Sequence, residues 1–133
     1  MKYIFWLTIF HAVTNSLYLV RFFGILPPED VVYGYVPWFM SFALPNTVFT
    51  LIAWLLIWFL WKKREKPAAV TALVLAGGLI FHGLNGLMFG FYTGYLQALS
   101  FNAVFEILVY LYGLALGAVY ICWFGRYESI RRQ

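Results

Sequence analysis

The sequence predicts an all-α membrane protein, a bundle of four transmembrane helices, from its composition and from the length of its apolar segments. Of the 133 residues, 64% are hydrophobic and only 11% are charged, so polar side chains are too few to cover a water-soluble globule of this size. Four apolar segments of about 20 to 25 residues fill almost the whole chain, and each can cross a hydrocarbon core about 30 Å thick. We therefore expect a single integral membrane domain over residues 1–133.

Each segment has recognisable ends. The expected spans are residues 3–26, 38–61, 67–91 and 101–124. The first ends before Pro27 because proline cannot continue a helix. It is also longer than the apolar part of a signal peptide, and no small-residue cleavage site follows it. The second stops at the basic run that begins with Lys62. Pro67 suits the first turn of the third span, and Gly125 is expected to cap the end of the fourth.

The basic residues predict the orientation of these spans. Eight of the nine Lys and Arg residues lie at Lys2, within 62–66 or within 126–132. Short loops rich in Lys and Arg stay on the cytoplasmic side. Both termini and the 62–66 loop are therefore expected in the cytoplasm, most simply at the plasma (inner) membrane of a prokaryote. These cations are expected to meet anionic membrane lipids. They form no patch with interleaved stacking aromatics, so no nucleic-acid partner is expected.

The ninth cation, Arg21, belongs to a polar stripe within the first span. Steps of four, three and three residues place four polar side chains on one helical face: His11, Asn15, Tyr18 and Arg21. The other spans contribute Asn46 directly after Pro45, His82 with Asn85, and Asn102 with Glu106 and Tyr110. Pro45 is expected to kink the second span and to free a carbonyl that needs a partner.

Depth predicts which of these side chains can meet. At 1.5 Å per residue, six of them fall about 8 to 15 Å below the outer ends of the spans: Arg21, Asn15, Asn46, His82, Asn85 and Glu106. One outer cluster is therefore expected, with His11 about 24 Å down and separate from it. Arg21 and Glu106 are the expected ion pair, because either charge alone at the centre of a helix costs about 2.5 to 3.5 kcal/mol. The pair could be a structural clamp or a functional site. Alternatively, Arg21 could reach outward to Glu29, Asp30 or a lipid phosphate.

Histidine, carboxylate and amide side chains leave several roles open. His82 and Glu106 are candidate acid and base groups, because histidine exchanges protons near neutral pH. The simpler alternative is that His82 and the asparagines only form hydrogen bonds between helices.

The segment Phe10–Asn15 resembles Phe81–Asn85 with a one-residue gap, which leaves open a duplication into two parallel helical hairpins. A haem b held by His11 and His82 stays a minor alternative, since the two estimated depths differ by about 9 Å. No other cofactor or metal is expected.

Small residues predict close helix packing. Gly113 and Gly117 form a GxxxG pattern in the fourth span, and Gly83, Gly86 and Gly90 form a similar stripe in the third. Such faces let two helices approach closely. They could close the bundle or join copies into a homo-oligomer.

Three classes of function follow. The first is a membrane site for a hydrophobic small molecule with a polar head, such as a lipid, isoprenoid, sterol or quinone. Its expected ligand contacts are Arg21, Asn15, Tyr18, Asn46, Asn85 and Tyr110, and acid–base chemistry at Glu106 and His82 would make it an isomerase-like enzyme. The second is a small proton- or cation-coupled transporter or channel that acts as an oligomer. The third is an accessory subunit of a larger membrane complex. The first is favoured because many aromatic side chains surround a few convergent polar groups.

Overall fold

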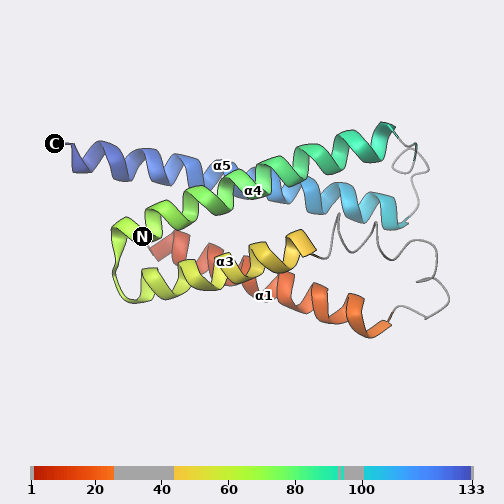
Figure 1. Ribbon diagram of the computed structural model, residues 1–133, viewed down its shortest axis with the longest axis horizontal. Helices are drawn as coiled ribbons and strands as arrows, with labels where there is room; N and C mark the ends of the chain where they lie inside the picture. Colours follow the sequence, from red (N-terminus) through yellow and green to blue (C-terminus); the bar gives the residue numbers. More distant parts are fainter. Residues whose placement is uncertain (1, 26–43, 93, 95–100, 133) are drawn as a thin grey trace. The chain divides into compact units, whose positions relative to one another are not determined.

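The computed structural model describes residues 2–25, 44–92, 94 and 101–132, without the side chains of residues 18, 20–25, 101–103 and 105 (Figure 1). This part of the chain is all-helical and contains four helices: α1 (Lys2–Ile25), α3 (Leu44–Trp61), α4 (Glu65–Tyr92) and α5 (Phe101–Arg131). The expected all-α class is confirmed. The chain forms two compact units: Met1–Ala68 contains α1, α3 and the first turn of α4, and Ala69–Gln133 contains the rest of α4 and α5.

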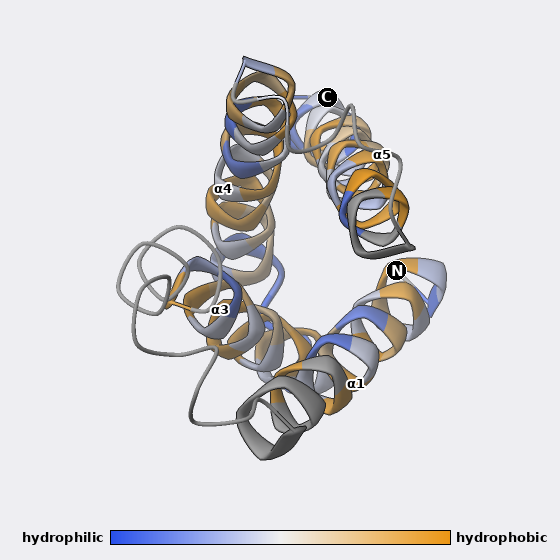
Figure 2. Ribbon diagram, turned by 90° about the vertical axis from the view of Figure 1, so that its right-hand side faces the viewer, coloured by the Kyte–Doolittle hydropathy of each residue, from blue (hydrophilic) through white to orange (hydrophobic). Residues whose placement is uncertain are grey.

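Three of the described helices are long and apolar enough to cross a membrane. They are α3, α4 and the part of α5 from Glu106 to Arg131. Their exposed side chains are largely hydrophobic, as expected of surfaces that contact lipid, and Figure 2 shows hydrophobic residues along all of these helices. These features support a membrane location for the chain. A crossing by α1 stays a prediction, and the start of the second expected span, at residues 38–43, lies outside the described residues.

Helices α1 and α3 pack together in the first unit. Their buried residues recur every three or four positions, which is the period of one helical face. The buried positions are Ile4, Thr8, His11, Ala12 and Leu19 on α1, and Asn46, Thr50, Ala53, Leu56 and Leu60 on α3. Pro45 lies in the first turn of α3, where a proline costs no helical hydrogen bond. The turn that it was expected to kink precedes Leu44 and lies outside the described residues.

A very short turn joins α3 to α4. The Arg64 N–H donates to the Phe59 carbonyl at 2.9 Å, and the Lys63 N–H donates to the Leu60 carbonyl at 3.1 Å. These are the two hydrogen bonds of a Schellman motif, with Lys63 in the left-handed position at φ 53°. The Arg64 carbonyl then accepts from the Ala68 N–H at 3.0 Å, so Arg64 also caps the start of α4.

The expected cap at Gly125 is wrong, because α5 continues through it to Arg131. A glycine inside a helix costs only about 1 kcal/mol relative to alanine, which is too little to end a long helix. The following turn has favourable charges: Arg131 and Arg132 lie 3.5 and 3.9 Å from the Glu128 carboxylate. Cations near a helix C-terminus also complement its dipole.

Candidate functional site

Asn15, Asn46 and Thr50 form a hydrogen-bonded network between α1 and α3. Asn15 Nδ2 donates to Thr50 Oγ1 at 2.7 Å and to the Asn46 carbonyl at 3.2 Å. Thr50 Oγ1 in turn donates to the same carbonyl at 2.7 Å. Asn15 therefore makes a hydrogen bond between helices, which is one of the roles that its sequence left open. Thr50 was not expected in this group, although its position four residues after Asn46 places both on one face of the helix.

A second contact lies beside this network. Trp54 Nε1 donates to Ser16 Oγ at 3.4 Å, and Ser16 Oγ donates to the Ala12 carbonyl at 2.6 Å. Trp54 follows Thr50 by one turn, and Ser16 follows Asn15 directly. His11 lies one turn before Asn15 and is buried, with 4% of its surface exposed. Within the first unit these contacts connect α1 to α3: Asn15 donates to Thr50, and Thr50 donates to the Asn46 carbonyl.

In the second unit, glycines bring α4 and α5 together. Gly83 lies against the Tyr110 carbonyl and Leu114, and Gly117 lies against Ile80 and the Ala76 carbonyl. A Cβ at Gly83 would come within 3.0 Å of Tyr110 O, and one at Gly117 within 3.1 Å of Ala76 O. Residue numbers fall on α4 as they rise on α5, so the two helices are antiparallel. These glycines pack within one chain, and association of copies stays a prediction.

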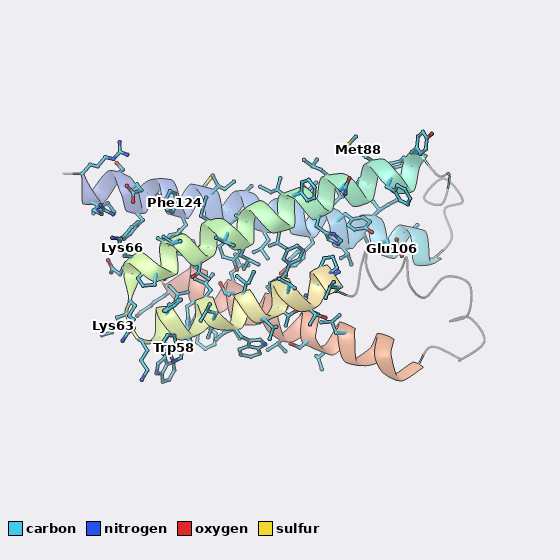
Figure 3. The ribbon with its side chains drawn as sticks, viewed as in Figure 1. Trp58, Lys63, Lys66, Met88, Glu106 and Phe124 are labelled. Atoms are coloured by element: carbon cyan, nitrogen blue, oxygen red, sulfur yellow. The ribbon has the colours of Figure 1, made fainter. Side chains whose placement is uncertain are left out.

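Tyr110 and His82 form the polar part of this helix pair. Their rings meet edge to face, with centroids 5.6 Å apart and planes at 70°. Tyr110 is 8% exposed, and its ring covers Gly86, one turn after His82. Glu106, labelled in Figure 3, is half-buried one turn before Tyr110 on α5. The α4–α5 register places Glu106 about level with Gly90.

Asn85 lies on the flank of α4 next to His82 and is exposed. Within the described part of the chain its side chain makes no hydrogen bond. Its neighbours on the surface of α4 are large and apolar: Phe81, Met88 and Phe89 are each at least 66% exposed. Asn85 is thus an amide on a surface otherwise suited to lipid, beside the partly buried His82. An amide in hydrocarbon is costly unless it finds a hydrogen-bond partner.

The expected outer cluster is described only in part. The side chains of Tyr18, Arg21 and Asn102, together with Glu29 and Asp30, lie outside the described residues. The Arg21–Glu106 pair therefore stays a prediction. His11 belongs to the first unit and His82 to the second, so shared haem ligation also stays a prediction. Among the described residues no three His, Cys, Asp or Glu side chains are grouped as metal ligands would be.

No protein-family model, no curated protein and no solved structure matches this chain. Any assignment of function therefore depends on the chemistry of the residues themselves. Those residues fall into two groups: the hydrogen-bonded network of Asn15, Asn46 and Thr50 in the first unit, and the group of His82, Asn85, Glu106 and Tyr110 in the second.

Proposed function

We propose that the α4–α5 pair binds, from the lipid phase, a hydrophobic small molecule with a polar head. The observation that carries this proposal is Asn85, an exposed amide on an apolar helix surface with no side-chain hydrogen bond in the described chain. A polar head group supplies the partner that lipid tails cannot. A lipid, isoprenoid, sterol or quinone has this combination of head and tail.

The surroundings of Asn85 support this class of ligand. His82 lies three residues before it on α4 and contacts Tyr110 of α5, so polar atoms converge from two helices. Phe81 and Phe89 offer exposed rings along which an apolar tail can lie. Ligand sites for such molecules combine large apolar walls with a few placed polar groups. The α4–α5 surface has both.

An acid–base role for the same group is part of the proposal. His82 and Glu106 on the facing helix are the candidate proton donor and acceptor, because histidine and carboxylate side chains are the usual acid–base groups of proteins. A ligand head that is hydrogen-bonded by Asn85 and lies beside His82 could exchange a proton there, as in an isomerisation. Binding comes first, and the chemistry depends on it.

Native mass spectrometry from mild detergent tests the binding step. Wild-type protein is expected to retain a co-purified small molecule, and Asn85→Leu and Glu106→Gln are expected to lose most of it while staying folded. Asn15→Leu is the matched control, because it removes an amide from the α1–α3 network and should lower stability without changing retention. Normal retention in Asn85→Leu would overturn the proposal.

The other functional classes predict different results in these spectra and in two further assays. An accessory subunit would appear with partner proteins, and a second copy on the Asn85 face would give a dimer that Asn85→Leu dissociates. Loss of a dimer in Asn85→Leu with the ligand still retained would identify Asn85 as a contact between copies. A transporter would require Glu106-dependent flux into sealed liposomes, and haem would give a Soret absorption band in the purified protein.

We also propose that α1 is a fourth span and that both termini face the cytoplasm. The cation clusters at Lys2, 62–66 and 126–132 support this orientation, because Lys and Arg are retained there. In a Cys122→Ser background, single cysteines at Lys63 and Ser129 should be protected from a membrane-impermeant maleimide in intact cells. Labelling of either cysteine from outside would contradict this orientation.

A further inference from the structure

The turn between α3 and α4 concentrates positive charge. Together with the first two residues of α4 it comprises Lys62, Lys63, Arg64, Glu65 and Lys66, and all five are exposed. Four cations less one anion leave a net charge of +3. Within the described chain none of these residues is in a salt bridge, whereas Arg131 and Arg132 at the end of α5 both pair with Glu128. The turn thus presents charge that the described protein does not neutralise.

The backbone of the turn holds a lysine where glycine fits better. Lys63 occupies the left-handed position of the Schellman motif, at φ 53°. Glycine is the usual residue there, because a side chain in this conformation crowds its own backbone. What lysine adds at this position is an exposed positive charge. Lys63 therefore adds a positive charge to the turn at a conformational cost that glycine would not have.

Exposed tryptophan rings beside the turn are typical of a segment at the membrane surface. Trp58 and Trp61 are 46% and 71% exposed at the end of α3, and Trp58, Lys63 and Lys66 lie at the same end of α3 and start of α4 in Figure 3. Tryptophan prefers the level of the lipid head groups. The Arg64 guanidinium lies 5.6 Å from the centroid of the Trp58 ring, so it is held against the side of the helix.

We propose that the α3–α4 turn is a binding surface for anionic phospholipid head groups. The lipid phosphate accepts hydrogen bonds from the Lys and Arg donors, and the acyl chains lie along the apolar side of α3 beside Trp58. The surface is separate from the α4–α5 site, because His82 follows Arg64 by about 27 Å of helix at 1.5 Å per residue. The proposal rests neither on that site nor on the direction in which the chain crosses the membrane.

Competition between two lipids tests the proposal. Purified full-length protein in mild detergent is mixed with equal amounts of phosphatidylglycerol and phosphatidylcholine, and native mass spectrometry measures the ratio of the bound lipids. Wild-type protein should favour phosphatidylglycerol. Lys62→Gln with Lys63→Asn should reduce that preference by about fivefold for each charge removed. Asparagine tolerates the left-handed conformation, so this variant keeps the turn intact.

Arg131→Gln with Arg132→Gln is the matched control, because it removes the same formal charge from the paired end of α5. It should keep the lipid preference within twofold of wild type. Equal retention of both lipids by wild-type protein would overturn the proposal. An equal loss in the control variant would do the same, by assigning the preference to net charge. Full displacement of phosphatidylglycerol by soluble glycerophosphate would show a general anion site and would also overturn it.

Discussion

The ring of Tyr110 on α5 lies directly over Gly86 on α4, in the space that any side chain at residue 86 would occupy. Tyr110 also contacts His82 one turn away, so one tyrosine connects the glycine packing to the polar group of this helix pair. The absence of a Cβ at Gly86 lets Tyr110 become buried between two helices. Packing and the proposed ligand site therefore depend on the same contact.

Gly86→Ala should destabilise the protein by about 1 to 3 kcal/mol, because the added methyl group overlaps the Tyr110 ring. Gly77→Ala is the control on the same helix. Nothing lies within 4 Å of a Cβ at Gly77, so this change should stabilise α4 by about 0.5 to 1 kcal/mol. Thermal unfolding in detergent measures both. Two glycine variants of equal stability would contradict the packing of Tyr110 over Gly86, and Tyr110→Leu should rescue Gly86→Ala.

Thr50→Val should weaken the α1–α3 network at nearly constant side-chain volume. Thr50 both accepts from Asn15 and donates to the Asn46 carbonyl, and hydrogen bonds between membrane helices contribute about 0.6 kcal/mol on average and up to about 1.7. A double-mutant cycle with Asn15→Leu isolates the Asn15–Thr50 term. Additive losses of stability in the double variant would mean that this hydrogen bond contributes nothing.

Lys63→Gly should stabilise the protein by about 1 to 2 kcal/mol, because glycine adopts the left-handed conformation without crowding. Lys66→Gly removes the same charge from the first turn of α4, where glycine should instead cost about 0.5 to 1 kcal/mol. Chemical unfolding followed by tryptophan fluorescence would show the opposite signs. A loss of stability in Lys63→Gly would mean that this residue does not hold a positive φ.

Gly125→Ala distinguishes a helix interior from a helix cap. Because α5 runs through Gly125 with nothing within 4 Å of a Cβ there, alanine should stabilise the helix by about 0.5 to 1 kcal/mol. At a left-handed cap the same change would destabilise it. Circular dichroism during thermal unfolding gives the sign, and a lower midpoint for Gly125→Ala would restore the cap that the sequence suggested.

The sequence by itself indicated a lipid environment, and it determined the helical class and the ends of several helices. Long apolar segments bounded by charged residues and proline are expected to be helices, because every backbone polar group must be hydrogen-bonded within lipid. The basic run at Lys62 does end α3, and Pro67 does lie in the first turn of α4. The expected cap at Gly125 was wrong because the helix propensity and the ion pairs of the residues that follow outweigh the small cost of one glycine.

Only the tertiary structure decided which polar residues bond to a neighbouring helix and which stay exposed. Helical spacing placed Asn15, Asn46 and Asn85 in similar positions, yet Asn15 pairs with Thr50 of α3, whereas Asn85 is exposed beside His82. The physical reason is that spacing determines which face of its own helix a residue occupies. Which neighbour covers that face depends on how the helices pack, and close approach at Gly83, Gly86 and Gly117 decides this for α4 and α5.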